Sequence, residues 1–164
     1  MRIAPAASAA RRLALCLAVA ISGFGASAAV ACDLAPNAAR LASDLGISVN
    51  TLRKNEGRPA LARNALLDTA AQRHACWLST NNSFSHTGSG GSTPKDRIKS
   101  AGYPARLSSE NIAHGQVSSD IVVADWMRSK GHRDNLLRQN ATDYGVGIAL
   151  LAGRTLWVMV YASR

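Results

Sequence analysis

Two neighbouring segments near the end of the chain have the apolar residues expected of β-strands. Within residues 143–150 the apolar positions are Tyr144, Val146, Ile148 and Leu150. We assign the same period of two to residues 156–161, all of them apolar, after the turn sequence Ala152-Gly153-Arg154. Because successive side chains of a strand point to opposite faces, this period predicts two strands. The short glycine-containing turn between them predicts that the chain ends in a β-hairpin.

The preceding two thirds of the chain show helical spacing instead. Residues 38–54 are predicted to be helical, with apolar positions at Leu41, Leu45, Val49 and Leu52. Gly57 and Pro59 end that helix. Residues 62–81 form the strongest predicted helix because they are rich in alanine. Its expected inward positions are Leu66, Ala70, His74 or Cys76, and Trp77.

Two shorter helices are predicted from their capping residues. Thr93-Pro94 opens one that ends at Gly102, and Ser118-Ser119-Asp120 opens another that leads to Trp126. Residues 82–92 are predicted to be an exposed loop, and residues 103–109 are expected to be irregular. Helices followed by a hairpin indicate a single α+β domain, with Trp77, Trp126 and Trp157 in its core.

The first 28 residues have the composition of a secretory signal peptide. Arg2, Arg11 and Arg12 precede the apolar residues 13–24, and small residues end at Ala28, with Ala31 as an alternative cleavage position. Cleavage after Ala28 would leave 136 of the 164 residues, enough for a sizeable core. No later segment is apolar for long enough to span a membrane. We therefore expect a soluble, monomeric protein that is secreted or periplasmic.

The positive charge of the chain is diffuse. Its formal net charge is +9, and loss of the three leader arginines would reduce it to +6. The remaining Lys and Arg are not clustered or interleaved with aromatic residues as in nucleic-acid-binding proteins, so we predict no nucleic-acid partner. Outside the cytoplasm, such charge favours contact with anionic wall polymers or lipid head groups.

Two cysteines remain after the leader, since Cys16 would be removed with it. An even pair in an exported chain predicts a disulfide between Cys32 and Cys76, which would hold the N-terminal segment against the domain. The alternative is lipoprotein anchoring at Cys32. Ala29 stands where such processing sites usually have leucine, which favours the disulfide.

Three polar side chains are candidates for chemistry. Residues 126–135 end a short helix, break at Gly131 and present His132, and residues at such breaks carry function more often than element interiors do. His86 precedes a glycine-rich loop, and Glu110 precedes an apolar segment. Each also has an ordinary structural interpretation: His86 as a helix cap, Glu110 as part of a surface turn, and His132 as a partner for the backbone.

An ordered set of motifs resembles bacterial CAP-domain proteins. This superfamily includes cysteine-rich secretory proteins, antigen 5 and plant pathogenesis-related proteins. The motifs are residues 53–61, Phe84-Ser85-His86, Glu110-Asn111-Ile112-Ala113, residues 126–137 and Gly145-Val146-Gly147. The resemblance covers residues 38–162 and implies an extracellular α-β-α sandwich. It also implies a cleft lined by His86, Glu110 and His132. The chain departs from eukaryotic members after Trp126, where Met127, Arg128 and Ser129 replace a second glutamate.

Two imidazoles and one carboxylate suit a divalent metal such as zinc, with water completing its shell. No serine lies in a nucleophile-elbow pattern, and an oxidised Cys76 would be a poor nucleophile. We therefore predict a binding module for a small molecule, lipid or wall component. One alternative is a metal-dependent hydrolase of peptide or wall substrates, with Glu110 as its base; another is a structural or adhesion module. His114 is expected to face the cleft if it has a role, and His74 to form one wall of the helix core or lie at the surface.

Overall fold

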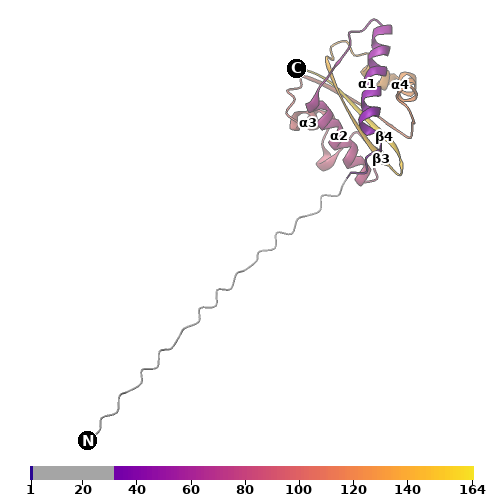
Figure 1. The fold of residues 1–164 in the computed structure, drawn as a ribbon. Helices are drawn as coiled ribbons and strands as arrows, with labels where there is room; N and C mark the ends of the chain where they lie inside the picture. The colour runs from indigo at the N-terminus through magenta and orange to yellow at the C-terminus, as the bar shows by residue number, and fades with distance from the viewer. Residues whose placement is uncertain (2–31) are drawn as a thin grey trace.

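The computed structural model describes Met1 and residues 32–164. Apart from Met1, the signal peptide predicted for residues 1–28 and both predicted cleavage positions lie outside the described residues. The described chain forms a mixed sheet with helices packed around it (Figure 1). Its helices are α1 (Ala38–Asn55), α2 (Ala65–Thr80), the 3-10 helix η1 (Ser89–Gly91), α3 (Pro94–Ser100), α4 (Ser119–Arg128) and α5 (Lys130–Leu136). Its strands are β1 (Ala62–Arg63), β2 (Leu107–His114), β3 (Asp143–Leu151) and β4 (Arg154–Ser163).

The sheet has the strand order β1-β3-β4-β2. β3 and β4 form the predicted hairpin, with Leu151 opposite Arg154 in an antiparallel register. The two turn residues, Ala152 and Gly153, have φ angles of 49° and 72°, as the favoured two-residue hairpin turn requires. β2 pairs antiparallel with β4, whereas the short β1 is parallel to β3. The hairpin is therefore the centre of the sheet.

The helices cover both faces of this sheet, and the predicted α-β-α sandwich is confirmed. Val146, Ile148 and Met159 belong to a buried cluster shared with α1, α4 and α5. Ala149 and Val158 belong to a second cluster shared with α2 and α3. Neighbouring strand residues thus point to opposite layers, as the period of two predicts. In Figure 1 the β3–β4 ribbon accordingly runs between α1 and α2.

Two glycines of β3 bring α2 very close to the sheet. A Cβ atom at Gly145 would overlap the backbone of Leu67 and Asp68, and one at Gly147 would overlap the backbone of Ala71. The helix side is equally small, because Ala70, Ala71 and Ala75 are buried there. The spacing between α2 and β3 is therefore set by backbone contact.

The outer edge of β3 is satisfied by side chains and by the N-terminal segment. Beyond β1, the Val146 amide donates to Asp68 Oδ1 at 2.8 Å. The Ile148 amide donates to Gln72 Oε1 at 3.0 Å, and Gln72 Nε2 donates to the Ile148 carbonyl at 2.9 Å. The Leu150 amide donates to the Asp33 carbonyl at 2.6 Å. These bonds take the place of a neighbouring strand, since buried backbone polar groups need partners.

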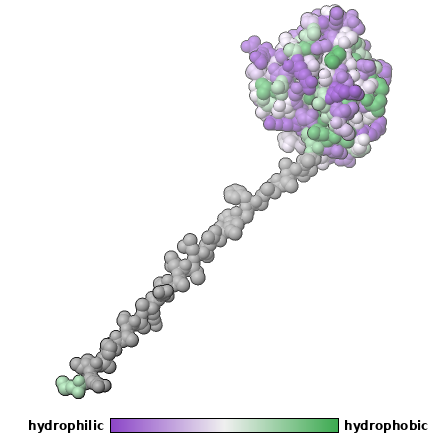
Figure 2. All heavy atoms as spheres, viewed as in Figure 1, coloured by the Kyte–Doolittle hydropathy of each residue, from purple (hydrophilic) through white to green (hydrophobic). Residues whose placement is uncertain are grey.

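The structure confirms the disulfide between Cys32 and Cys76, whose Cα atoms are 5.0 Å apart. It joins the start of the described domain to α2 and places Asp33 beside β3. Hydrophilic and hydrophobic residues are interspersed on the face shown in Figure 2. Across Met1 and residues 32–164, no helix is both long enough and apolar enough to cross a bilayer.

The helix predicted at residues 62–81 begins later than expected. Ala62 and Arg63 pair with β3, and α2 begins at Ala65 after Asn64, whose side chain accepts from the Leu66 amide. Ala70 and His74 are buried as predicted, but Leu67 is buried in place of Leu66, which is 39% exposed. At Ala62 and Arg63, helix propensity is outweighed by the pairing with β3, which is a tertiary contact. Trp77 is only partly buried, whereas Trp126 and Trp157 lie in the core as predicted.

Two further expectations were wrong. Residues 107–109, predicted to be irregular, begin β2, so Glu110 lies in a strand and not in a surface turn. The break after Trp126 occurs at Ser129, whose φ and ψ are −97° and 121°, and Gly131 and His132 lie inside α5. The predicted helices at residues 38–54, after Thr93 and after Ser118 are confirmed, the one after Thr93 ending at Ser100.

Candidate functional site

Glu110 is a buried carboxylate whose two oxygens face different cationic or polar donors. It comes from the middle of β2, and its side chain is 1% exposed. His86 Nδ1 lies 2.8 Å from Oε1, and Arg97 Nη2 donates to Oε2 at 2.7 Å. A buried carboxylate needs such partners, since an isolated one is costly to desolvate. Glu110 is thus held in one orientation.

Arg97 organises this side of the site, and sequence reasoning did not identify it. It lies in α3, whose start is fixed by a capping box between Thr93 and Asp96. Besides Glu110, its Nη1 donates to the carbonyls of His86 and Ser92 at 3.1 and 2.7 Å. One guanidinium therefore joins β2 to two points, His86 and Ser92, of the segment between α2 and α3. No local pattern marks this arginine, because its partners are distant in sequence.

His74 forms a buried wall behind the same carboxylate, as one of its two predicted roles required. Its Nε2 lies 3.0 Å from the Ser85 carbonyl and 3.7 Å from Glu110 Oε1. Burial lowers the pKa of His74, although the nearby Glu110 charge acts in the opposite direction. The ring is therefore neutral near pH 7 and supports the backbone next to His86.

His86 lies beyond the end of α2, so it does not cap that helix. Its side chain is 50% exposed, and its Nδ1 is used by Glu110. A carboxylate that accepts from one ring nitrogen fixes the tautomer and leaves the other nitrogen as a basic acceptor. His86 Nε2 is therefore the nitrogen available for a ligand.

His132 is brought next to β2 by two asparagines. Asn111 Nδ2 donates to the His132 carbonyl at 3.0 Å, and Asn135 Nδ2 donates to Asn111 Oδ1 at 2.9 Å and to the Glu110 carbonyl at 3.2 Å. Burial lowers the pKa of His132, and the charge of a protonated His86 lowers it further. The two histidines thus influence each other electrostatically, although no direct contact joins their rings.

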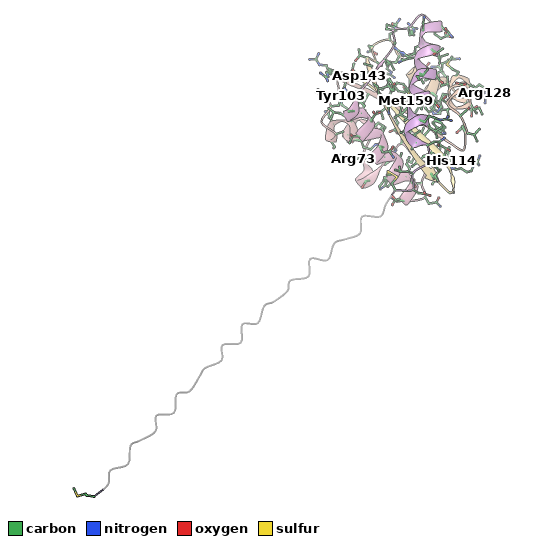
Figure 3. The ribbon with its side chains drawn as sticks, viewed as in Figure 1. Arg73, Tyr103, His114, Arg128, Asp143 and Met159 are labelled. Atoms are coloured by element: carbon green, nitrogen blue, oxygen red, sulfur yellow. A yellow bond between two sulfur atoms is a disulfide. The ribbon has the colours of Figure 1, made fainter. Side chains whose placement is uncertain are left out.

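A cavity of about 500 Å³ opens beside His132, between α4, α5 and β2. It is lined by both apolar and polar side chains: Phe84, Ile112, Ala113 and Trp126 are apolar, and His114, Gln116, Asp125, Ser129 and His132 are polar. Two ring pairs border it, Phe84 with His114 at 6.1 Å and Trp126 with His132 at 6.3 Å between centroids. Figure 3 places His114 and Arg128 on the side of the domain away from Arg73.

The polar groups of the cavity are largely held by neighbours. His114 Nε2 lies 2.8 Å from the Leu151 carbonyl. Asp125 accepts from Gln116 Nε2 at 2.8 Å and pairs with Arg128. His114 and Asp125 both line the cavity. Asp125 thus supplies a carboxylate there, although Met127, Arg128 and Ser129 occupy the position of the second family glutamate.

The donor set fits a metal differently from the three-ligand prediction. Within Met1 and residues 32–164, no group of three or more His, Cys, Asp or Glu side chains is arranged to hold a metal ion. Glu110 uses both oxygens for His86 and Arg97, and it does not line the cavity. Glu110 is therefore placed to orient His86 and not to coordinate an ion directly.

The family assignment follows from comparison with known sequences. The family model CAP, described as the Cysteine-rich secretory protein family, matches residues 48–161. The chain belongs to this family. The CAP match spans most of the domain described above, including β2, α5 and the central hairpin, and confirms the resemblance inferred from the ordered motifs.

Two proteins of Bacillus subtilis are similar to the chain in sequence. The chain is 36% identical over 115 residues to the Bacillus subtilis protein YkwD, covering 70% of this chain and 44% of the relative. It is 31% identical over 99 residues to the Bacillus subtilis membrane protein YlbC, covering 60% of this chain and 29% of that protein. The match thus spans less than half the length of each.

Solved structures share the fold. An outer surface protein of Borrelia burgdorferi superposes with a TM-score of 0.74 at 22% identity, over 82% of this chain and 99% of that one. An extracellular SCP-domain protein of Bacillus anthracis gives 0.70 at 24% identity, over 82% and 45%. The α-β-α architecture is therefore that of a CAP domain.

Proposed function

We propose that this CAP protein is a secreted binding module whose cavity beside His132 takes a small extracellular ligand, either free or as part of a lipid or wall component. One observation carries the proposal: the cavity is open and bordered by the rings of Phe84, His114, Trp126 and His132, whereas Glu110 is buried and does not line it. A volume of about 500 Å³ suits a small molecule, because ligand sites usually measure roughly 300–1,000 Å³.

The bonding of Glu110 favours binding over catalysis. A general base must reach the proton that it removes. Glu110 is buried, and an arginine and a histidine engage its oxygens. Taking a proton from water would require the carboxylate to give up one of these partners. We therefore expect little or no hydrolysis of generic peptides.

A divalent metal such as zinc is part of the same proposal. His86 Nε2 and the ring of His132 would supply the protein ligands, with Glu110 holding His86 in the required tautomer. Bound zinc would polarise an oxygen atom of the ligand. With so few protein donors its affinity should be modest, and protonation of the histidines should release it below about pH 6.

The ligand proposal can be tested by native mass spectrometry of the protein purified from its own periplasm or medium. Wild type should carry an additional mass that Phe84→Ala loses, because Phe84 lines the cavity. Leu66→Ala is the matched control, since Leu66 is also an exposed apolar side chain but belongs to α2. No added mass in wild type, or equal retention in all three proteins, would contradict the proposal.

The metal proposal needs a separate measurement. Calorimetric titration of zinc at neutral pH should give binding heat with wild type and with His114→Ala, but not with His86→Ala. The heat should disappear near pH 5.5, since imidazoles are protonated there. Equal heats for wild type and His86→Ala would exclude the site. Zinc-dependent peptide cleavage that is lost in His132→Ala would instead support the hydrolase alternative.

A further inference from the structure

A second cavity, of about 440 Å³, lies at the C-terminal half of α1. Its walls come from α1, from the segment that follows it and from Tyr144 of β3, and its lining includes Gly46, Lys54, Arg58 and Ala60. No histidine and no acidic side chain lines it. Its volume is in the range of small-molecule sites, and its residues are separate from those of the cavity beside His132.

We propose that this cavity binds an anionic group, a phosphate or a carboxylate, carried by a small molecule. Lys54, Arg58 and the hydroxyl of Tyr144 are the donors. Lysine and arginine are the usual partners of such anions, and arginine matches their geometry with two donors at once. Ala60 and the exposed Ile47 offer an apolar wall for the rest of the molecule.

The two cations are unpaired within the described domain. Among residues 32–164, neither Lys54 nor Arg58 takes part in a salt bridge. The Nε atom of Arg58 is buried and has no hydrogen-bond partner there. A partly buried guanidinium without a carboxylate is unfavourable, and an anion in the cavity would supply a counter-charge through the part of Arg58 that lines it.

A third positive charge lies behind them. Arg53 is fully buried and donates to the carbonyls of Pro59, Leu136 and Arg138. Burial lowers the pKa of Arg53, and the charge of nearby Arg58 also contributes to lowering it, but arginine stays protonated at physiological pH. The positive field of Arg53 and Arg58 therefore adds to the attraction for an anion.

The C-terminal end of α1 does not cancel the positive field of Arg53 and Arg58. The carbonyls of Leu52, Arg53 and Lys54 accept from the amides of residues 56, 58 and 57, respectively. Carbonyls at a helix C-terminus repel anions mainly while they lack partners. Since these three carbonyls have hydrogen-bond partners, an anion can lie beside Lys54 at the last turn of α1 with little electrostatic repulsion.

Tyr144 reaches the cavity because residue 46 is glycine. A Cβ atom there would lie 2.7 Å from Cζ of Tyr144 and overlap its hydroxyl. Burial raises the pKa of Tyr144, so its hydroxyl remains a donor at neutral pH. That hydroxyl makes no hydrogen bond to another residue of the described domain, which leaves it free for a ligand.

The wall that carries Arg58 is fixed in place before any ligand arrives. Asn50 Nδ2 donates to the Leu61 carbonyl at 3.0 Å, and the Leu61 amide donates to Asn50 Oδ1 at 2.8 Å. Arg53 Nε donates to the Pro59 carbonyl at 2.9 Å. A site held in this way loses less conformational entropy on binding, so even a small anion should bind measurably.

The test is an NMR titration of the protein with phenyl phosphate, benzoate and neutral benzyl alcohol. The two anions should shift the amides of Gly46, Thr51 and Tyr144, and benzyl alcohol should not. A stronger response to phenyl phosphate would identify a phosphate site, and one to benzoate a carboxylate site. Arg58→Gln should weaken binding about tenfold, because a charge-assisted hydrogen bond is lost.

Three variants keep the result interpretable. Lys99→Gln removes the same charge as Lys54→Gln from an exposed position on α3, and only Lys54→Gln should weaken binding. Tyr144→Phe should weaken it while leaving the thermal midpoint nearly unchanged. Equal weakening by both lysine variants would show diffuse attraction to charge and overturn the proposal, as would equal shifts with benzyl alcohol.

Discussion

Replacing Glu110 by glutamine should destabilise the domain strongly although the side chain keeps its shape. The amide oxygen can still accept from Arg97, and its N–H group can donate to His86 only if that ring changes tautomer, but the side chain no longer carries a negative charge. The side chains of Glu110 and Arg97 are 1% and 11% exposed, and their ion pair measures 2.7 Å. The variant would leave the charge of Arg97 buried without a counter-ion.

The magnitude follows from that burial. Removing one partner of a buried ion pair costs about 3–5 kcal/mol, mostly because the other charge is left uncompensated. In a domain of roughly 130 residues this corresponds to a fall in the thermal midpoint of roughly 10–20 °C. Arg128→Gln is the control: its ion pair with Asp125 leaves the arginine side chain 73% exposed, so its loss should cost less than about 1 kcal/mol.

Urea unfolding of a double-mutant cycle measures the effect. Glu110→Gln, Arg97→Gln and the double variant should be compared, and the double variant should lose clearly less stability than the two single losses added together. Additive losses would refute the reasoning, since they would mean that the two charges stabilise the domain independently. The reasoning would also be refuted if Glu110→Gln lowered the free energy of unfolding by less than Arg128→Gln does.

Three further predictions concern the rest of the domain. Replacing Cys32 and Cys76 by serine should lower the free energy of unfolding by about 2–4 kcal/mol, because the 44-residue separation no longer restricts the unfolded chain; an unchanged urea midpoint would contradict this. The pKa of His74 is lowered in the folded state, so the unfolded state binds more protons below about pH 6.5. The free energy of unfolding should therefore decrease as the pH is lowered through that range. That dependence should be weaker in His74→Gln, as urea titrations between about pH 7.5 and 5 would reveal. Gly147→Ala should cost about 1–3 kcal/mol or more by overlap with α2, whereas Gly131→Ala, which meets nothing within 4 Å, should be neutral or stabilising in the same assay.

Much of the fold was predictable because its signals are local. The hairpin has a regular period and a turn at Ala152 and Gly153, and the start of α3 has a capping box at Thr93. The disulfide follows from the number of cysteines and the expected compartment. Each of these features depends on residues close together in the chain or on composition alone.

The remainder depends on tertiary contacts. β2 has a polar sequence because Glu110 and Asn111 are buried in hydrogen bonds to distant residues, and a strand of this kind has no clean apolar period. Arg97 lacks a local signature for the same reason. Sequence indicated His86, Glu110 and His132 as a group, but it could not show that Arg97 and His86 occupy the carboxylate.

The hydrogen bonds along the edge of β3 have a consequence for aggregation. An open strand edge is a template onto which another chain can add. Here Asp68 and Gln72 cover part of that edge from α2, and Asp33 covers the Leu150 amide only while the N-terminal segment is held nearby. The disulfide provides that attachment. Reduction would therefore do more than loosen a loop: it would release Asp33 and open the end of the strand to pairing between molecules, so the reduced protein should self-associate more readily than the oxidised protein.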